Sequence, residues 1–243
     1  MRNQTPFQAI TYDYWNTLIK ETTDSLNRRK SLWTELLLDA GYEVNQSQLD
    51  TAFSLGWQFF DRQWRSNTQT GLDEVVAVVI KALPIKISVS LHPLLRDAYL
   101  EASKSTARTL LPEVEETFKY LHESGTPVGV VCDVGTIPSP VLKQWLVDLG
   151  IFDLIDFFGF SDEIKVYKPD HRIFEKTLKG LGAKDPSRTA HIGDLKRTDV
   201  AGARSFGMVA IRYTGAREDD EEVEDGDYVS NSHLDILQFL NIL

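Results

Sequence analysis

Carboxylates at two distant places in the chain have the spacing of a reactive or metal-binding site. Asp13 directly follows a short apolar stretch, Ala9–Tyr12, and Asp194 comes just after a second one, Thr189–Ile192. Asp199 follows five positions after Asp194. A carboxylate at the end of a buried strand is costly unless a cation or a reacting group meets it. These positions therefore predict one shared site.

A lysine adds a positive charge to this set. Lys168 precedes Pro169 in a loop before a predicted helix that carries Phe174 on its apolar face. This context favours Lys168 over the nearby Lys165 as the site residue. Because ligands of open parallel sheets bind at the carboxyl ends of the strands, we expect Lys168 to join the aspartates there.

The elements that must position these residues alternate between strand and helix. The first strand is predicted at about Phe7–Tyr12, and Pro112 suits the start of a later helix. Continuous apolar strands that alternate with helices imply a parallel sheet covered on both faces. The sequence therefore predicts an α/β fold with a doubly wound, Rossmann-like parallel sheet as its core. The further strands are predicted at Val128–Val131, Phe157–Phe160, Thr189–Ile192, Met208–Arg212 and Tyr228–Val229, and the helices at Val141–Leu149, His171–Gly180, Asp199–Phe206 and Leu234–Leu240.

A long insertion after the first strand has a different pattern. Apolar residues recur there at helical spacing, as in Leu49, Phe53, Trp57 and Phe60, and no convincing strand interrupts them. We predict two domains, an α/β core of residues 1–20 and 106–243 and a helical domain of residues 21–105.

Composition narrows the classes of protein. The 243 residues can bury the core of one domain and a smaller second one. No apolar run approaches the roughly 20 residues that cross a bilayer, and the first residues lack the apolar core of a signal peptide. The lone cysteine, Cys132, excludes an intramolecular disulfide and fits a reducing cytoplasm. We therefore expect a cytoplasmic protein without a membrane partner.

The net charge of −10 is concentrated in one segment. Eight carboxylates lie between Glu218 and Asp227, which leaves the rest of the chain near −2. This balance favours neither nucleic acid nor an anionic membrane as a partner. The acidic run lacks the ligand spacing of a calcium loop, so we interpret it as a solvated surface loop.

The order and spacing of the separated motifs resemble those of the haloacid dehalogenase-like hydrolase superfamily. That family has an aspartate nucleophile after its first strand, a lysine before proline, and Gly-Asp followed by a further aspartate. Asp13, Lys168, Asp194 and Asp199 match these positions. The resemblance implies that the helical insertion is a cap domain, an antiparallel bundle that covers the active site.

The resemblance also implies a cofactor. Asp13, Asp194 and Asp199 would hold Mg²⁺ together with the backbone carbonyl of Trp15. Magnesium prefers hard oxygen ligands. Three aspartates and Lys168 sum to −2, which repels a phosphate dianion, and one Mg²⁺ brings the sum to zero.

The activity implied is that of a hydrolase, with Asp13 as a nucleophile that forms a covalent intermediate. Lys168 would neutralise Asp13 and the transferring group as a point charge. The leading hypothesis is a magnesium-dependent phosphatase that acts on a small phosphorylated metabolite through an aspartyl-phosphate. The sequence gives no indication of the oligomeric state.

Trp15 departs from the family pattern. Phosphatases of the family carry a second aspartate at this position as general acid, and an indole cannot serve in that role. Such catalysis is worth about 10²–10⁴-fold. An alkyl phosphate would suffer this loss fully, and an acyl or aryl phosphate much less. Alternatively, Trp15 is a packing residue and the acid comes from elsewhere.

A second departure is Cys132-Asp133, where the family has Ser or Thr, often followed by Asn. A thiol is a weaker hydrogen-bond donor than a hydroxyl. Asp133 would repel an anion unless it is protonated, paired with a cation or turned away. Thr136, or backbone N–H groups of the turn at Val134, could bind phosphate oxygens instead. The predicted phosphate-binding residues are Cys132, Asp133, Thr136 and Lys168.

Two alternatives remain open. The metal-free haloacid dehalogenases also carry an aromatic residue two positions after the nucleophile, but they lose the Gly-Asp motif that is present here at Asp194. A non-catalytic, regulatory binding protein is the other alternative, because Trp15, Cys132 and Asp133 all depart from the catalytic pattern.

Overall fold

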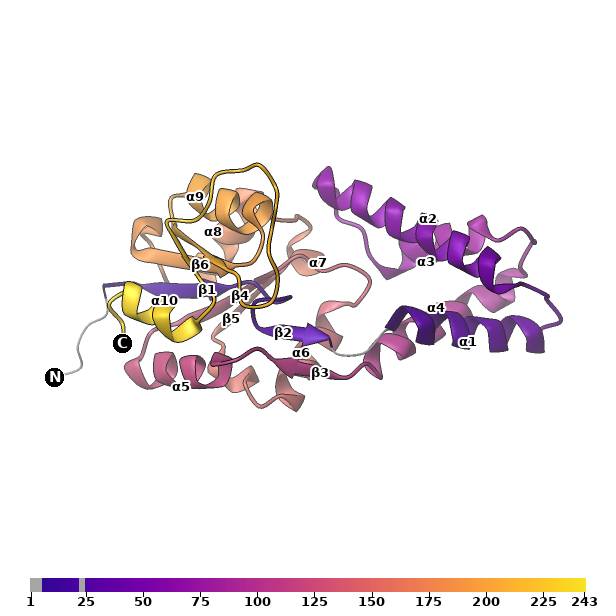
Figure 1. Cartoon of the computed structure of the whole chain (residues 1–243), viewed down its shortest axis with the longest axis horizontal. Helices are drawn as coiled ribbons and strands as arrows, with labels where there is room; N and C mark the ends of the chain where they lie inside the picture. The colour runs from indigo at the N-terminus through magenta and orange to yellow at the C-terminus, as the bar shows by residue number, and fades with distance from the viewer. Residues whose placement is uncertain (1–5, 22–24) are drawn as a thin grey trace. The chain divides into compact units, whose positions relative to one another are not determined.

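The computed structural model describes residues 6–21 and 25–243, and its contacts divide the chain into two compact units (Figure 1). The α/β unit comprises the described residues of Met1–Lys20, Thr109–Asp133 and Lys143–Leu243. The helical unit comprises those of Glu21–Arg108 and Val134–Leu142. The sequence placed residues 134–142 in the α/β domain, whereas their contacts group them with the helices. Residues 22–24 of the predicted helical domain lie outside the described residues.

The α/β unit contains a six-stranded parallel sheet in the order β5-β4-β1-β6-β7-β8. The chain starts at β1 in the middle, adds β4 and β5 on one side, and then adds β6 to β8 on the other. This order confirms the predicted doubly wound fold. The strands are β1 (Ala9–Tyr12), β4 (Val128–Cys132), β5 (Phe157–Phe160), β6 (Thr189–Gly193), β7 (Val209–Tyr213) and β8 (Tyr228–Ser230).

Helices cover both faces of this sheet, with α8 and α9 on one side and α5 and α10 on the other (Figure 1). All five residues of β4 are buried, as expected for a strand between two helical layers. The first two residues of the helix predicted at 199–206 belong to a π-helix, Lys196–Val200, and the α-helix begins at Ala201. The helices are α5 (Val114–Ser124), α6 (Ser139–Asp148), α7 (Ser161–Ile164), α8 (His171–Gly180), α9 (Ala201–Phe206) and α10 (His233–Phe239), with 3₁₀ turns at Phe152–Leu154 and Pro186–Arg188.

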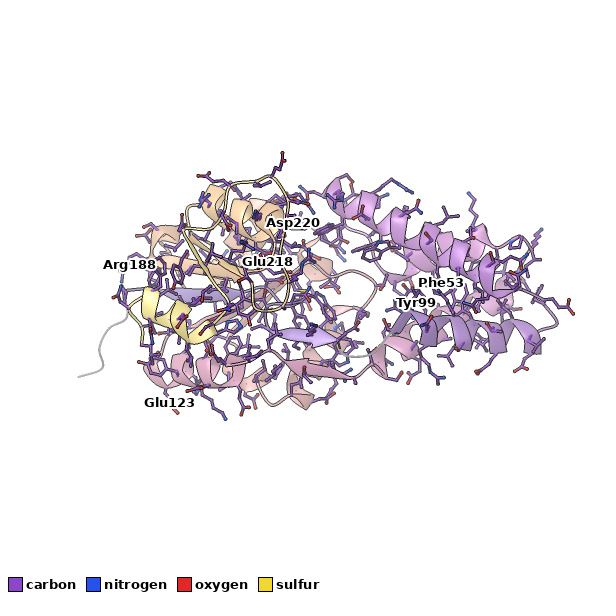
Figure 2. The ribbon with its side chains drawn as sticks, in the orientation of Figure 1. Phe53, Tyr99, Glu123, Arg188, Glu218 and Asp220 are labelled. Atoms are coloured by element: carbon purple, nitrogen blue, oxygen red, sulfur yellow. The ribbon has the colours of Figure 1, made fainter. Side chains whose placement is uncertain are left out.

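The helical unit has its own apolar core. Trp33 packs edge-to-face on Phe53 with ring centroids 5.0 Å apart, and Phe53 stacks on Tyr99 (Figure 2). The Trp33 indole is buried and donates to the carbonyl of Leu95 at 2.8 Å.

Among the helices of the described residues, none combines the length and the apolar character that a membrane span requires. The helices are α1 (Ser25–Asp39), α2 (Gln46–Arg65), α3 (Leu72–Ala82) and α4 (His92–Lys104), with a 3₁₀ turn at Val89–Leu91.

The sequence analysis missed two short strands, which pair with each other where the chain enters and leaves the helical insertion. They are β2 (Ile19–Glu21) and β3 (Arg108–Leu110), and they form a separate two-stranded sheet. Three residues are too few to show the alternation by which a strand is recognised.

The segment after β4 packs on the helical unit. A Cβ atom at Gly135 would lie 2.9 Å from the ring of Phe60, so that ring lies directly against the backbone. Gln69 also donates its side-chain amide to the carbonyl of Val134 at 3.3 Å. These contacts explain why residues 134–142 group with the helices.

Candidate active site

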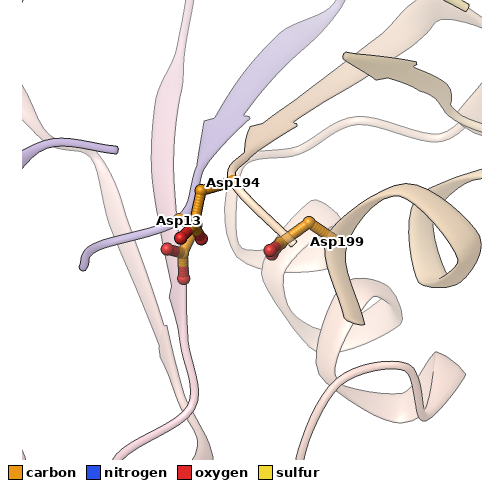
Figure 3. A group of neighbouring side chains, drawn as sticks. All are labelled: Asp13, Asp194 and Asp199. Carbon is orange, nitrogen blue, oxygen red and sulfur yellow. The ribbon is translucent and has the colours of Figure 1, made fainter. Parts of the chain in front are cut away.

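The three predicted aspartates converge at the carboxyl edge of the sheet. Asp13 follows β1, and its backbone N–H donates to Ile192 of the neighbouring β6 at 2.7 Å. Asp194 follows the end of β6, and Asp199 points towards both from the π-helix (Figure 3). Each of the three residues is buried and offers an oxygen within 4.8 Å of an oxygen of the others.

Lys168 lies between two of these carboxylates. Its ammonium donates to Asp13 Oδ1 at 2.5 Å, to Asp199 Oδ1 at 2.6 Å and to the carbonyl of Val131 at 3.0 Å. These three acceptors use all its donors. Burial alone would lower the pKa of Lys168, but Asp13 and Asp199 outweigh burial and raise it well above its usual value. Lys168 is therefore a fixed, permanently charged partner of both aspartates.

Asp199 is saturated with hydrogen bonds. Its Oδ1 accepts from Lys168 and lies 3.1 Å from Nε2 of His191, and its Oδ2 accepts from the backbone N–H of Leu195 and the hydroxyl of Thr198. Burial raises the pKa of Asp199, but Lys168 and His191 outweigh it and hold the pKa well below its usual range. Asp199 is therefore an ionised carboxylate of fixed orientation.

The sequence analysis did not single out His191, which supports Asp199 from within β6. An ionised carboxylate can only accept, so Nε2 of the neutral ring must carry the proton that faces Asp199. Nδ1 then accepts from the hydroxyl of Thr11, 2.9 Å away on β1. Burial lowers the pKa of His191, which favours this neutral form. The feature of the sequence that could have identified His191 is its position as a histidine inside an apolar strand.

Asp13 and Asp194 have fewer hydrogen bonds than Asp199. Asp13 Oδ2 accepts a long hydrogen bond of 3.4 Å from the hydroxyl of Thr17, and the backbone N–H of Tyr14 also donates to the Asp13 carboxylate. Asp194 Oδ2 has no hydrogen-bond partner within the described structure. Burial raises the pKa of Asp13 to about 7. The charge of Lys168 lowers this pKa, and the charge of Asp199 raises it further. Burial and the other two aspartates raise the pKa of Asp194 to about 8. The cluster thus holds more negative charge than its cations neutralise.

Arg217 is a further site residue that the sequence analysis missed. Its Nε lies 3.4 Å from Asp194 Oδ2, a distance and geometry that make an ion pair but no hydrogen bond. Arg217 is the single cation in the loop 214–227, directly before the acidic run. This single positive charge beside an acidic run was the feature of the sequence that could have identified Arg217 as a site residue.

The predicted general-acid position is occupied by aromatic packing. The indole of Trp15 is half-buried and makes edge-to-face contacts with Trp145 and Tyr14, at centroid distances of 5.9 and 5.1 Å. Asn16 has a φ of 56°, a left-handed conformation that Asn tolerates, and so turns the chain directly after Trp15. Trp15 therefore contributes aromatic packing to the α/β unit.

The predicted phosphate-binding residues lie in different surroundings. Cys132 is fully buried at the end of β4, and burial raises the pKa of its thiol well above the usual value. Asp133 accepts the backbone N–H of Lys168 at 2.8 Å, so at least one of its oxygens faces a donor. Thr136 belongs to the segment that groups with the helical unit.

The donor set fits a hard divalent cation. Carboxylate oxygens are the ligands that Mg²⁺ takes in proteins, and the open, buried Oδ2 of Asp194 is an acceptor that such an ion would satisfy. Asp13 Oδ2, whose hydrogen bond from Thr17 is long at 3.4 Å, could serve as a second ligand. The unneutralised charge of the cluster favours a cation at the same place.

Comparisons with known proteins agree with this geometry. A glyceraldehyde 3-phosphate phosphatase of Methanothermobacter thermautotrophicus is 28% identical over 235 residues, which cover 94% of this chain and 93% of that protein. A ribulose-1,5-bisphosphate 5-phosphatase of Halopiger xanaduensis is 26% identical, over 71% of this chain and 77% of its own. The crystal structure of a 2-haloacid dehalogenase from Pseudomonas syringae shares the fold, with a TM-score of 0.70 at 20% identity over 97% of this chain and 98% of its own. A family model described as haloacid dehalogenase-like hydrolase matches residues 7–207. The chain belongs to the haloacid dehalogenase-like hydrolases.

Proposed function

We propose that this protein is a magnesium-dependent phosphatase that acts on a small phosphorylated metabolite through an aspartyl-phosphate at Asp13. The observation that carries the proposal is the environment of Asp13 at the carboxyl edge of the sheet. Lys168 holds Oδ1 at 2.5 Å, while the hydrogen bond that Oδ2 accepts from Thr17 is long, at 3.4 Å. The names of the two phosphatase relatives support a phosphorylated sugar or a similar small substrate. In this proposal the helical unit serves as the substrate-selecting cap domain.

The metal would be held by Asp13, Asp194 and Asp199 with the carbonyl of Trp15. Asp194 has an oxygen without a hydrogen bond, and the bond from Thr17 to Asp13 Oδ2 is long, whereas Asp199 would have to release one of its four donors. When bound, Mg²⁺ would neutralise the carboxylates and polarise the phosphoryl oxygens.

In the first step, a carboxylate oxygen of Asp13 forms a bond to phosphorus while the bond from phosphorus to the leaving oxygen breaks. Lys168 keeps Asp13 oriented and ionised during this attack. In the second step, water attacks phosphorus, the bond to Asp13 breaks, and inorganic phosphate leaves. The free carboxylate is restored and the proton of the water passes to solvent. The indole N–H of Trp15 is a hydrogen-bond donor but too weak an acid to protonate the leaving group, which in this proposal takes its proton from solvent.

The test is the hydrolysis of acetyl phosphate and p-nitrophenyl phosphate with Mg²⁺ and with excess EDTA. We expect turnover only with the metal, and its loss in Asp13→Asn. Asp50→Asn is the matched control, because Asp50 is exposed on the helical unit and pairs only with polar surface residues. Turnover that survives Asp13→Asn would contradict the proposal.

The same preparation separates the two alternatives. Release of chloride from 2-chloropropionate without metal would support a dehalogenase. A folded protein that is inactive on every substrate, and that binds no Mg²⁺, would support a non-catalytic role.

A further inference from the structure

The loop 214–227 between β7 and β8 is fixed to the α/β unit in spite of its negative charge. Asp219 is only 6% exposed, and its Oδ2 accepts the backbone N–H of Lys196 at 2.7 Å. Asp225 accepts from Nε of Arg212 at 2.7 Å. Its carbonyl also accepts from Arg204 at 2.6 Å. The acidic residues that the sequence led us to place in solvent therefore include the anchors of this loop.

One of these anchors attaches the loop to the catalytic cluster. Lys196 is the first residue of the π-helix that carries Asp199. Arg217 precedes the anchored Asp219 by two residues. Its guanidinium therefore reaches Asp194 from a tethered backbone.

The two cations at the cluster differ in what they can still bind. All three donors of Lys168 are used, and its side chain is 2% exposed. The side chain of Arg217 is 45% exposed, and within the described residues its guanidinium has the ion pair with Asp194 and no hydrogen bond. A guanidinium has five N–H donors. Arg217 can therefore accept an anionic ligand without losing an existing hydrogen bond.

We propose that Arg217 forms an anion-binding subsite that takes two oxygens of the transferring phosphoryl group, an inference that rests on the proposed function. The planar guanidinium fork matches two phosphate oxygens, which the compact ammonium of a lysine does not. A divalent cation on Asp194 would neutralise the carboxylate that now attracts Arg217 and would leave the guanidinium to the substrate.

The charge at the site supports this assignment. With Arg217 included, the three ionised aspartates and the two cations sum to −1. A divalent cation changes this sum to +1, which attracts a phosphate dianion, whereas the sum without Arg217 is zero. The same loop would thus convert a neutral site into an attractive one.

The test is calorimetric titration of the whole chain with inorganic phosphate at saturating Mg²⁺, and separately with Mg²⁺ alone. The variants are Arg217→Gln and Arg217→Lys. Arg188→Gln is the control, because Arg188 precedes β6 whereas Asp194 follows it, and it removes the same charge from the far end of one strand. Figure 2 shows Arg188 at one end of the α/β unit, away from Glu218 and Asp220 of the loop.

We expect Arg217→Gln to raise the Kd for phosphate by about 10-fold to 100-fold, the worth of hydrogen bonds to a charged group. Arg217→Lys should recover only part of this loss, and Arg188→Gln should bind as the wild type. The affinity for Mg²⁺ alone should not fall in Arg217→Gln, because a competing cation has been removed. Equal phosphate affinity in wild type and Arg217→Gln would overturn this inference alone. A wild-type protein that binds neither Mg²⁺ nor phosphate would overturn it together with the proposed function.

Discussion

A Cβ atom at Gly193 would lie 2.3 Å from Cγ of Asp199, so the carboxylate occupies its place only because residue 193 has no side chain. We predict that Gly193→Ala displaces Asp199 and, through their shared contact, Lys168. Such a displacement should lower kcat/KM at least about 10²-fold and the free energy of unfolding by about 1–3 kcal/mol. Gly71→Ala is the control, since a Cβ there has no neighbour closer than 3.7 Å. Steady-state kinetics and urea unfolding check both effects, and near-normal turnover in Gly193→Ala would contradict the prediction.

Replacement of Lys168 should affect stability as well as catalysis. Lys168→Met leaves Asp13 and Asp199 without their shared partner, and removal of one member of a buried ion pair costs about 3–5 kcal/mol. Lys119→Met removes an exposed pair with Glu115 and should cost less than about 1 kcal/mol. Urea unfolding in the absence of metal measures the difference. Similar losses in the two variants would show that Lys168 is not the main counter-charge of the cluster.

The packing of Trp15 predicts a substrate preference. Because this position has no proton donor, acyl and aryl phosphates should be hydrolysed faster than alkyl phosphates by about 10²-fold or more. Trp15→Asp should raise the rate for alkyl phosphates selectively, if the loss of the contact with Trp145 is tolerated. Circular dichroism must confirm that the variant is folded. Equal kcat/KM values for acetyl phosphate and glycerol phosphate in the wild type would contradict the predicted preference.

The burial of His233 predicts that its own contribution to stability is lost in acid. Burial lowers the pKa of His233 from 6.5 to about 4, and the neutral ring lies 3.0 Å from the carbonyl of Thr17, to which Nε2 can donate. The unfolded chain therefore binds a proton below pH 6.5 that the folded protein resists until about pH 4. The contribution of His233 to the free energy of unfolding should fall across this interval by up to about 3 kcal/mol. Asp13 and Asp194, whose raised pKa values favour the folded protein in acid, contribute with the opposite sign.

Urea unfolding at pH 7 and pH 4.5 checks the effect of His233. His233→Gln should remove this contribution, so the variant should gain stability relative to the wild type on going from pH 7 to pH 4.5, and the exposed His122→Gln should not. The same dependence on pH in wild type and His233→Gln would contradict the assignment.

Residues that follow buried strands could be located from the sequence because strand ends of a parallel sheet share one edge. The structure brings together Asp13, Asp194 and Lys168, as predicted, and it confirms the doubly wound sheet. Their apolar strands are long enough to give a clear pattern. Asp199, five positions after Asp194, joins the same cluster.

Other features depend on contacts that leave no periodic signal. Arg217 reaches Asp194 because Asp219 binds the backbone of Lys196, a pairing between a loop and a helix start 23 residues apart. The hydrogen bond from His191 to Asp199 likewise requires the register between β1 and β6, where Thr11 lies opposite His191. Neither relationship follows from composition or local spacing.

The contact between Phe60 and Gly135 has a consequence for engineering. The helical unit is built from two stretches of polypeptide rather than one, since Val134–Leu142 belongs with Glu21–Arg108. A chimaera that transplants only the long insertion would leave the Phe60 ring without the backbone it rests on. To exchange substrate preference between relatives, a chimaera should therefore need both segments, Glu21–Arg108 and Val134–Leu142, from the same parent.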